Sequence, residues 1–381
     1  MKRECGMDLT ELRDQIDEID SQIVELYERR MDVCSKVADY KIETVKKVFD
    51  RSREAEKIAK VGALTHNEFN RHGVEELFEQ IMSVSRKLQY RKLSESKRGG
   101  RLPFIGVDTL DTEHARVVFQ GTAGSYSQAA MFAYFGESID SFHVETFRDA
   151  MSAIDEGAAD FAVLPIENSS AGIVSENYDL LVKFENYIVA EQIIKIDNCL
   201  LGLKGTTEEE IKTVYSHPQA LMQCARYLDE HRNFKQISFS NTALAAEKVL
   251  RDNDRTQAAI AGAHAAKLYG LEVIREKINF SSGNSTRFII VTNQKIFRKD
   301  AKKVSICFEV KHESGSLYHI LSHFIYNNLN MNKIESRPME DRPWEYRFFL
   351  DFDGNLEDGA VRNALRGLRE ETLNMKILGN Y

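Results

Sequence analysis

Residues 283–288 have the sequence Gly-Asn-Ser-Thr-Arg-Phe and lead directly into the apolar segment 289–291. A polar loop that leads into a buried strand is a common place for a binding or catalytic site. Side chains alternate between the two faces of a strand, so Thr286 and Phe288 should share one face and their neighbours the other. This alternation places one hydroxyl group beside an aromatic ring. The alternative is a loop whose Ser and Thr side chains bond only to their own backbone.

The chain on the N-terminal side of this stretch alternates short apolar segments with helical ones. Strands are expected at 117–119, 161–164, 213–215 and 258–260, and helices at 147–154 and 219–228. This alternation predicts an α/β domain with a largely parallel sheet. Binding sites in such domains lie at the C-terminal ends of the strands.

Three polar clusters follow the predicted strands, at 120–127, 165–170 and 216–224. None has the dinucleotide-binding spacing G-x-G-x-x-G, although an anion site made of backbone N–H groups is possible at the first. Each cluster alone could be a helix cap. All three clusters are expected at the sheet edge that also carries Thr286. Their common position favours a binding or catalytic site there.

These segments resemble the prephenate dehydratase family over residues 116–293. The resemblance lies in residues 124–127, 165–169 with Gly172, 215–219 and 286–288, in that order. It implies that prephenate loses water and carbon dioxide to give phenylpyruvate, with Thr286 donating a hydrogen bond to the departing hydroxyl. It also implies that the substrate is bound by residues from all of these segments: Ser125, Tyr126, Ser127, Glu167, Asn168, Ser169, Ser216, Gln223, Thr286, Arg287 and Phe288.

Three residues of this set and its surroundings have more than one possible role. Glu167 is either a proton source or structural. Strict alternation turns Arg287 away from Thr286, which favours a structural ion pair over carboxylate binding. His217 precedes Pro218 at a strand end and is expected to be structural.

The N-terminus carries a long helical pattern. Apolar residues recur at spacings of three and four from Leu9 to Tyr40, which predicts an amphipathic helix over 9–41. Such a helix would be about 50 Å long and could not bury its apolar stripe within one small domain. We therefore expect it to pair with the same helix of a second chain in an intertwined homodimer. Arg30 lies within the stripe, where it either extends to the surface or is held inward for a ligand.

A third helix near residue 80 should place Leu77, Phe78, Ile81 and Leu88 inward. Ser85 and Gln89 share that face, and uncharged polar groups on an apolar face need partners. A cationic group opposite them would suit a small dianion; it consists of Arg13, Arg30, Lys41 and Arg53. From spacing alone, Asp50, Arg53 and Glu54 could equally form surface ion pairs.

These helical residues resemble the all-helical chorismate mutase family over 9–90. The resemblance implies rearrangement of chorismate to prephenate, in which the enzyme holds the carboxylates and stabilises charge on the ether oxygen. Arg13 of the partner chain, Arg30 and Arg53 would bind carboxylates. Lys41 and Gln89 would donate to the ether oxygen. Asp50, Glu54 and Ser85 would orient the ring hydroxyl and a carboxylate.

The last eighty residues predict a ferredoxin-like order of strand, helix, strand, strand, helix, strand. Gly315, Ser316 and Leu317 at a helix start resemble one phenylalanine-binding motif of ACT regulatory domains. Glu335, Ser336, Arg337 and Pro338 at a strand end resemble the other. The resemblance implies L-phenylalanine as an allosteric effector bound between paired ACT domains. The alternative is a solubilising or dimerising module.

Composition limits the partners. The formal net charge of −8 leaves no basic excess for nucleic acid. No apolar run approaches the roughly 20 residues needed to span a bilayer. The five cysteines lack zinc or disulfide spacing. We expect a cytoplasmic protein without metal or cofactor.

The sequence thus predicts a multi-domain chain. Residues 1–92 form an all-α mutase bundle, 93–115 a flexible linker, 116–293 a bilobal α/β dehydratase domain and 302–381 an α+β ACT domain. Together these regions resemble the bifunctional chorismate mutase/prephenate dehydratase family, which implies chorismate and prephenate as substrates in L-phenylalanine biosynthesis and a homodimer or homotetramer. The alternative is a non-catalytic sensor of small anions and amino acids with the same domains.

Overall fold

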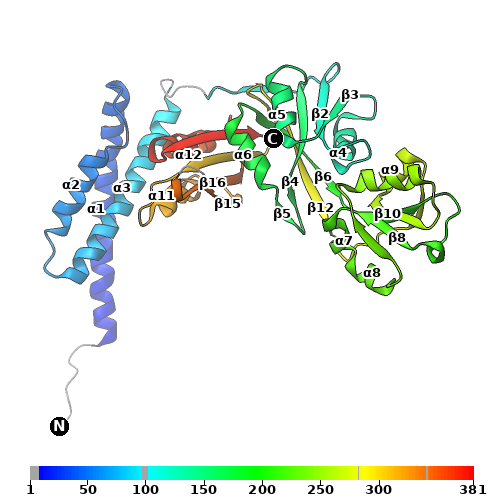
Figure 1. The fold of residues 1–381 in the computed structure, drawn as a ribbon. Helices are drawn as coiled ribbons and strands as arrows, with labels where there is room; N and C mark the ends of the chain where they lie inside the picture. Colours follow the sequence, from blue (N-terminus) through cyan, green and yellow to red (C-terminus); the bar gives the residue numbers. More distant parts are fainter. Residues whose placement is uncertain (1–7, 97–101, 282, 340–341) are drawn as a thin grey trace, which may run out of the picture. The chain divides into compact units, whose positions relative to one another are not determined.

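The computed structural model describes residues 8–96, 102–281, 283–339 and 342–381. The chain forms two compact units (Figure 1). The first combines the N-terminal hundred residues with Phe308–Met375, and the second combines Pro103–Cys307 with Lys376–Tyr381. In the described part of the chain, no helix has the length and apolar character needed to cross a membrane.

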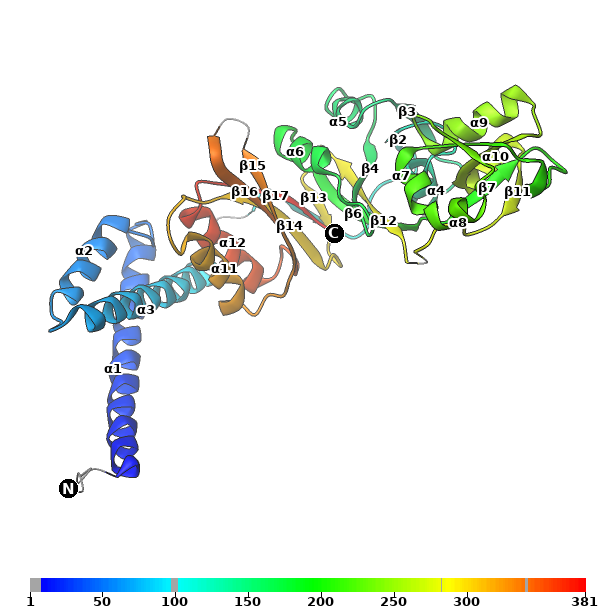
Figure 2. The same cartoon turned by 60° about the horizontal axis from the view of Figure 1, so that its bottom comes forward.

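Three helices form the N-terminal part of the first unit: α1 (Leu9–Glu43), α2 (Arg51–Gly62) and α3 (Glu68–Glu95). Each begins after a residue whose side chain accepts a hydrogen bond from the first turn, namely Asp8, Asp50 or Asn67. The long helix predicted over 9–41 is confirmed, and its 35 residues correspond to about 52 Å. Its N-terminal end extends past α3 (Figure 2).

The apolar stripe of α1 is uncovered in the single chain. Ala38 is buried, whereas Ile16, Ile23 and Val33 are 56%, 53% and 58% exposed. The prediction that Leu77 points inward is wrong for the single chain, because its exposure is 51%. Leu77 lies on α3 before the buried residues of that helix, which begin at Met82.

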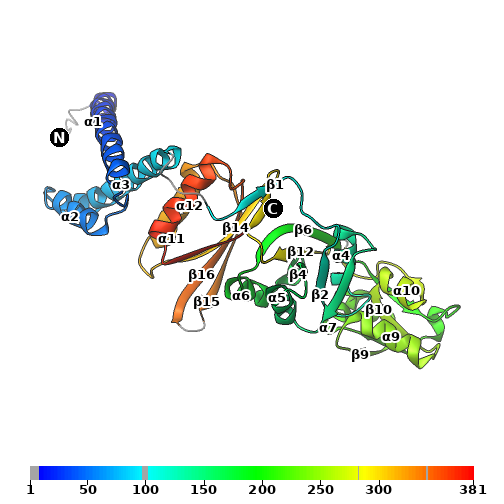
Figure 3. The same cartoon turned by 90° about the horizontal axis from the view of Figure 1, so that it is seen from above.

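The C-terminal region, whose part Phe308–Met375 belongs to the first unit, shows the predicted order of elements. These are β14 (Lys303–Glu309), α11 (Ser316–Tyr326), β15 (Met331–Met339), β16 (Arg342–Asp353), α12 (Gly359–Glu371) and β17 (Asn374–Asn380). The strands β15 and β16 pair antiparallel, and β15 is the edge of the sheet. Helices α11 and α12 lie side by side over one face of the sheet (Figure 3), and both also contact α3.

The first lobe of the second unit is a mixed sheet with three helices. Its strands are ordered β6-β12-β4-β2-β3. Its elements are β2 (Arg116–Gln120), α4 (Tyr126–Phe135), β3 (Asp140–Val144), α5 (Phe147–Asp155), β4 (Phe161–Asn168), β5 (Gly172–Ile173), α6 (Ser175–Lys183), β6 (Tyr187–Lys195) and β12 (Ser285–Thr292). Buried apolar residues of β2, β4 and α4 form its core, including Phe119, Val163 and Met131.

The second lobe is another mixed sheet, in the order β11-β7-β10-β8-β9. Its elements are β7 (Asn198–Gly202), η1 (Glu208–Glu210), β8 (Thr213–Ser216), α7 (Pro218–Gln223), α8 (Ala225–Glu230), β9 (Lys235–Ser238), α9 (Thr242–Asp252), β10 (Gln257–Gly262), α10 (Ala263–Tyr269) and β11 (Glu272–Arg275). Apolar clusters lie on both faces of this sheet, around Leu201 and Leu200.

Three predictions need correction. The sheets are mixed and not largely parallel, because β12 runs antiparallel to both β4 and β6, and β7 antiparallel to β10. The helix predicted over 219–228 is interrupted at Cys224, which ends α7 and precedes α8. The join predicted over 93–115 is ordered in part: α3 continues to Glu95, and β1 (Ile105–Val107) pairs with β13 (Ile296–Arg298).

The antiparallel pairing of β12 with β4 positions residues 283–288, which include the start of β12. Thr286, near the start of β12, lies opposite Asn168, the last residue of β4. A strand start therefore meets a strand end at this edge of the sheet, so residues more than a hundred positions apart become neighbours.

Candidate active sites

A cavity of about 490 Å³ opens between the two lobes of the second unit. The first lobe contributes residues of α4, β4, β5 and β12, and the second contributes residues of β7, α7 and α9. The described lining residues are Tyr126, Ser127, Pro165, Asn168, Ala171, Gly172, Ile173, Val174, Ile196, Asn198, His217, Gln219, Ala220, Gln223, Asn241, Thr242, Thr286 and Phe288. Thr286 and Phe288 share this face, as the alternation predicts.

Asn168 fixes the orientation of the Thr286 hydroxyl. Its Oδ1 accepts from the backbone N–H groups of Ser170 and Ala171, at 3.0 and 2.9 Å. Because those groups can only donate, the amide Nδ2 must face Thr286, and it donates to Thr286 Oγ1 at 2.8 Å. The hydroxyl proton of Thr286 is not used in this bond and can be donated into the cavity.

Further polar contacts lie around the cavity, and the bond between Gln223 and Ser170 connects the two lobes. Gln223 donates from Nε2 to Ser170 Oγ at 3.0 Å and accepts at Oε1 from Asn198 Nδ2 at 3.2 Å. Tyr126 donates its hydroxyl to the carbonyl oxygen of Asp197 at 3.0 Å. The sequence analysis missed Asn198, which is 1% exposed in the fold. The signal available in the sequence was a polar residue directly before the apolar segment 199–201.

The described lining of the cavity contains no Asp, Glu, Lys or Arg side chain. Three helices begin at it: α4 after Ser125, α7 after His217 and α9 after Asn241. A helix N-terminus presents unpaired N–H groups and a partial positive charge, so it attracts anions. The cavity can therefore bind a carboxylate without a cationic side chain.

Five of the predicted substrate-binding residues do not belong to this described lining. Ser125 caps α4 by accepting from the N–H of Gln128 at 3.3 Å. Ser169 accepts from the N–H of Ser285 at 3.0 Å and so ties two loops together. Ser216 is fully buried and donates to the carbonyl oxygen of Ile260 at 2.6 Å.

The other two, Glu167 and Arg287, form an ion pair on the opposite face of β4 and β12. Arg287 Nη2 lies 3.1 Å from Glu167 Oε2, and its Nη1 lies 3.4 Å from Glu191 Oε2. Both side chains alternate with the cavity-facing Asn168 and Thr286. This geometry favours structural roles for the pair.

His217 has a capping role and also lines the cavity. Its Nδ1 accepts from the N–H of Gln219 at 3.3 Å, at the start of α7. Burial lowers the pKa of His217 below its ordinary value, which favours the neutral ring.

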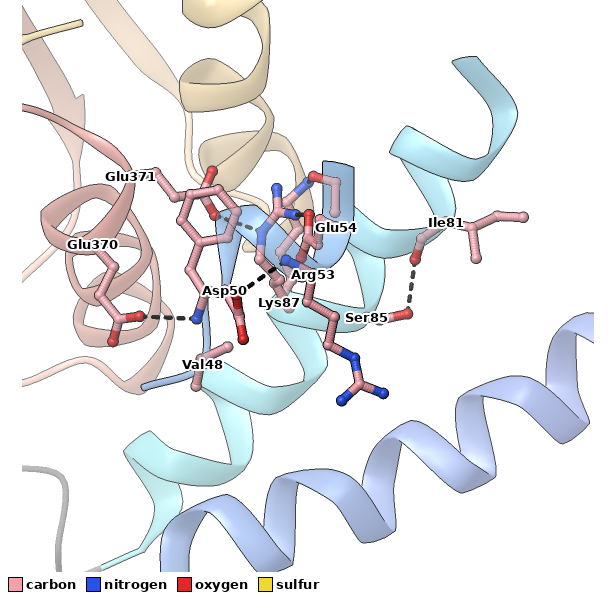
Figure 4. Close-up of polar contacts among 12 residues, drawn as sticks. Val48, Asp50, Arg53, Glu54, Ile81, Ser85, Lys87, Glu370 and Glu371 are labelled. Carbon is pink, nitrogen blue, oxygen red and sulfur yellow. Dashed lines mark hydrogen bonds and ion pairs between the residues drawn. The ribbon is translucent and has the colours of Figure 1, made fainter. Parts of the chain in front are cut away.

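In the first unit, α1 and α3 bring a second set of predicted residues together. Arg30 Nη1 donates to Ser85 Oγ at 2.5 Å, so Arg30 is held inward and does not extend to the surface. Ser85 in turn donates to the carbonyl oxygen of Ile81 at 2.8 Å (Figure 4). Gln89 is 7% exposed and donates to the carbonyl oxygen of Ser85 at 3.2 Å. Its Oε1 is buried with no partner among the described residues.

Lys41 and the start of α2 form the adjoining part of this set. Lys41 Nζ donates to the carbonyl oxygen of Val48 at 2.6 Å, and burial lowers the pKa of Lys41 below its ordinary value. Asp50 caps α2 by accepting from the N–H of Arg53 at 3.2 Å. This bond, with a second from Ser52, lowers the pKa of Asp50.

Arg13 lies on the same continuous helix as Arg30, seventeen positions earlier. At a rise of 1.5 Å per residue the two are about 26 Å apart along the axis. Arg13 therefore cannot join Arg30, Lys41 and Arg53 within one chain.

Glu54 has partners that the sequence analysis missed. Its Oε2 accepts from Arg86 Nη1, and Arg86 Nε donates to Glu371 Oε1 of α12 at 2.9 Å. Arg86, Lys87 and Tyr90 are all buried on α3. The sequence signal for their burial was weak. It was the presence of charged and aromatic residues beside Ser85 and Gln89, and a helical pattern alone predicts that such charged residues face solvent.

The residues predicted to bind an effector lie on two elements of the C-terminal part. Gly315 has a left-handed φ of +77° and precedes α11, which starts at Ser316 and Leu317. Glu335, Ser336, Arg337 and Pro338 lie within the edge strand β15, which continues to Met339 and does not end at Ser336.

Two observations concern metal and thiol chemistry. In the described ranges, no group of three or more His, Cys, Asp or Glu side chains is placed to hold a metal ion. Within the described part of the chain, Cys34, Cys199, Cys224 and Cys307 form no disulfide bond. Cys5 lies outside the described residues.

Comparison with known proteins matches both regions. Residues 12–90 match chorismate mutase type II, and residues 117–296 match prephenate dehydratase. The bifunctional chorismate mutase/prephenate dehydratase of Escherichia coli (strain K12) is 32% identical over 383 residues, covering 98% of this chain and 96% of that protein.

Two solved structures resemble about the same share of this chain. The prephenate dehydratase from Arthrobacter aurescens, in complex with L-Phe, has 30% identity and a TM-score of 0.65, covering 70% of this chain and 89% of its own. GqqA, described as a novel type of quorum quenching acylase, has 30% identity and a TM-score of 0.63, covering 70% of this chain and 97% of its own.

Both catalytic regions are thus present on one chain, in the order and over nearly the full length of the relatives. The chain is an enzyme of L-phenylalanine biosynthesis that rearranges chorismate to prephenate and converts prephenate to phenylpyruvate, and it belongs to the bifunctional chorismate mutase/prephenate dehydratase family.

Proposed function

We propose that Thr286 is the catalytic donor of the dehydratase, acting in the cavity between the two lobes. The observation that supports this most strongly is the bond from Asn168 Nδ2 to Thr286 Oγ1, which leaves the hydroxyl proton for the substrate. A threonine is a weak acid, so the hydroxyl acts as a positioned hydrogen-bond donor to the departing ring hydroxyl. Aromatisation of the ring drives the loss of water and carbon dioxide.

The remaining cavity residues orient prephenate. The N-termini of α4 and α9 favour its carboxylates. Tyr126, Ser127 and Gln223 provide neutral polar groups around them, and Phe288 forms an apolar wall. Ser125, Ser169 and Ser216 support this site through the backbone, and the Glu167–Arg287 pair supports it from the opposite face of the sheet.

For the mutase, we propose that Arg30 and Arg53 bind the carboxylates of chorismate and that Lys41 and Gln89 donate to the ether oxygen. Gln89 is a neutral donor, so its contribution does not titrate. Asp50, Glu54 and Ser85 orient the ring hydroxyl and a carboxylate. The bond from Arg30 to Ser85 supports this arrangement, because it brings the predicted cation onto the predicted polar face.

The mutase site is completed by a second chain in this proposal. The stripe of α1 is more than half exposed at Ile16, Ile23 and Val33, and such a continuous apolar face marks an interface. Pairing of two α1 helices in an intertwined homodimer would cover the stripe and bring the partner's Arg13 to the site. Two dimers could associate further into a tetramer.

We also propose that the C-terminal domain is an ACT domain that binds L-phenylalanine and inhibits the enzyme. The Arthrobacter aurescens relative is described in complex with L-Phe, and its structure covers 70% of this chain. The expected contacts are Gly315, Ser316 and Leu317 at the start of α11, where a helix N-terminus suits a carboxylate, and Glu335, Ser336, Arg337 and Pro338 on β15. The edge position of β15 makes it available to a second domain.

One experiment tests the whole scheme. The purified protein is supplied with chorismate, and chorismate, prephenate and phenylpyruvate are followed together with and without L-phenylalanine. Phenylpyruvate should form and should decrease when L-phenylalanine is added. Formation that does not respond to L-phenylalanine would contradict the regulatory part alone.

The mutase assignment has its own variant. Arg30→Ala should lower chorismate consumption by about 100-fold, the range expected when a hydrogen bond to a charged group is lost. Prephenate supplied directly should still be converted. Unchanged chorismate consumption would mean that the mutase site lies elsewhere.

A further inference from the structure

The C-terminal end of α12 contacts the start of α2 within the first unit (Figure 4). Two consecutive glutamates, Glu370 and Glu371, make these contacts. The side chain of Glu371 is 5% exposed and that of its partner Arg86 is 7% exposed. A charged pair this deeply buried must be matched, because an isolated buried charge is strongly unfavourable.

Arg86 is shared between the two domains. Its Nε donates to Glu371 Oε1 at 2.9 Å, and its Nη1 donates to Glu54 Oε2. The guanidinium also lies over the ring of Phe49, 4.6 Å from the ring centre. One cation therefore links a glutamate of α12 to the glutamate proposed to orient chorismate.

A second side chain lies close to the Glu371 carboxylate without a hydrogen bond of good geometry. His323 Nε2 of α11 lies 3.2 Å from the same Oε1 atom. Burial alone would raise the pKa of Glu371, but His323 and Arg86 outweigh it and hold that pKa at about 2. The carboxylate is therefore ionised throughout the working range of pH and remains available to Arg86.

Glu370 and the backbone of Glu371 hold the residues just before and at the start of α2. Glu370 Oε2 accepts from the backbone N–H of Phe49 at 3.3 Å and from the hydroxyl of Tyr90 at 3.1 Å. Arg51 Nη2 donates to the carbonyl oxygen of Glu371 at 3.3 Å. The segment 49–54, which carries Asp50, Arg53 and Glu54, is thus attached to α12 directly at Phe49 and Arg51, and through Arg86 at Glu54.

We infer that Glu370 and Glu371 of the C-terminal domain are positioning residues for the chorismate mutase, fixing the start of α2 through Phe49 and the carboxylate of Glu54 through Arg86. This inference rests on the proposed role of Glu54. It makes the mutase dependent on the C-terminal domain for its full activity, because the N-terminal helices provide Arg86 with only one of its two carboxylate partners. A displaced α12 would release Arg86 and with it Glu54.

The test uses the full-length protein and compares mutase and dehydratase turnover in each variant. Glu371→Ala leaves Arg86 Nε without a buried acceptor, so the guanidinium moves and displaces Glu54. We expect the mutase kcat/KM to fall about 10- to 100-fold, since a shift of about 1 Å in a catalytic group can cost this much. Dehydratase turnover should stay within about twofold of the wild type, which reports that the second unit is folded, and the circular-dichroism helix signal should match the wild type, which reports that the helices of the first unit are retained.

Two further single variants refine the expectation. Glu371→Gln keeps an acceptor for Arg86 and should retain more mutase activity than Glu371→Ala. Glu357→Ala removes an exposed glutamate of the same domain, just before α12, and should leave both activities unchanged.

A double-mutant cycle separates positioning from general stability. If Glu371 acts through Glu54, then Glu371→Ala should have little further effect in the Glu54→Gln background. Two results would overturn the inference, provided that Glu54→Gln alone is impaired. One is that the losses of mutase activity in the two single variants add up in the double variant, and the other is that Glu371→Ala keeps full mutase activity. Full mutase activity in Glu54→Gln itself would instead overturn the proposed role of Glu54, and the inference with it.

Discussion

The two reactions share one dicarboxylate, prephenate, as product and as substrate, yet the two proposed sites offer it opposite chemistry. The mutase region presents cationic side chains from α1 and α2, namely Arg30, Lys41 and Arg53. The described lining of the dehydratase cavity contains helix N-termini, amides and hydroxyls, but no Lys or Arg. The fold explains this difference.

The backbone N–H groups in the middle of a helix are already bonded within the helix, so its sides can offer only side chains. Away from their first turns, the helices of a bundle can bind a carboxylate only through side chains, and Arg and Lys give the strongest such contacts. In an α/β lobe, helices begin where strands end, and their N-termini provide unpaired N–H groups at one edge of the sheet. The dehydratase can thus be built from neutral residues.

The same difference affects how complete each site is. The dehydratase cavity is lined by two lobes of one unit of a single chain. Of the mutase residues, Arg30 lies on the exposed helix α1, about 26 Å along the axis from Arg13, and the segment at the start of α2 is attached to α12. The mutase should therefore be sensitive to changes outside its own helices, and the dehydratase should not.

The largest expected effect is that of Thr286→Ala. Loss of the positioned donor should lower phenylpyruvate formation by about 1,000-fold, within the range for a group that assists proton transfer, while prephenate formation is spared. Thr286→Ser, which keeps the hydroxyl, should retain substantial activity. An equal loss of both activities in Thr286→Ala would refute the independence of the two sites.

A second variant tests whether the mutase needs a partner chain. Ile23→Asp places a carboxylate in the α1 stripe, where burial of an unpaired charge is strongly unfavourable. The dimer should dissociate, as measured by light scattering. The mutase should then lose about 100-fold in kcat/KM, because a charge-assisted contact from Arg13 is lost. The dehydratase lobes should keep their turnover.

The matched control is Ser21→Asp, which adds the same charge to α1 outside the apolar stripe. It should leave both the mass in solution and the mutase rate unchanged. A dimer that survives Ile23→Asp would mean that the stripe is covered in some other way.

A third variant concerns the direction of one hydrogen bond in the dehydratase. Asn168→Asp preserves the shape of the side chain, but a carboxylate cannot donate to Thr286. The threonine proton would turn toward the carboxylate and away from the cavity, so dehydratase kcat should fall about 10- to 100-fold. A wild-type rate would show that the orientation of the Thr286 hydroxyl is unimportant, and mutase kinetics measured on the same protein provide the control.

The smallest effect is a difference in pH dependence. Burial lowers the pKa of Lys41 below the ordinary 10.5, so this donor loses its proton at a lower pH than a free lysine does. The mutase kcat/KM should therefore decrease on the alkaline side before pH 10.5. In the dehydratase cavity, burial lowers the pKa of His217 below 6.5 and raises that of Tyr126 above 10.

Neither cavity residue should therefore titrate between pH 7 and 10, and the dehydratase profile should be flat over that range. The check is a pair of pH profiles on one protein preparation, with Lys41→Arg expected to move the alkaline limb of the mutase to higher pH. An alkaline limb shared by both activities would indicate unfolding in place of a single titration.

Much of the fold could be predicted because its signals are local. The period of the apolar residues from Leu9 to Tyr40 predicted α1 correctly, and alternation along 285–291 predicted that Thr286 and Phe288 share a face. Alternation likewise turned Arg287 away from Thr286, and the structure pairs it with Glu167. These are properties of neighbouring residues on one helix or strand, and they survive in any fold that keeps the element.

The directions of the strands and the contacts between distant segments were not predictable in this way. The expectation of a largely parallel sheet was wrong. The direction of a strand depends on the path by which the chain leaves the sheet and comes back to it, and no local sequence pattern indicates that path. The burial of Arg86 was missed for a similar reason. Its two carboxylate partners lie 32 positions before it and 285 positions after it.

The sequence by itself determined the elements, the chemistry of the candidate residues and the resemblance that identifies both reactions, since these depend on residue type and spacing. Tertiary structure alone decided three things. It placed Thr286 opposite Asn168, built the dehydratase cavity from three helix N-termini, and attached Glu54 to Glu371 through Arg86. Each depends on burial and on distances between segments far apart in the chain, and these come into existence only when the segments pack.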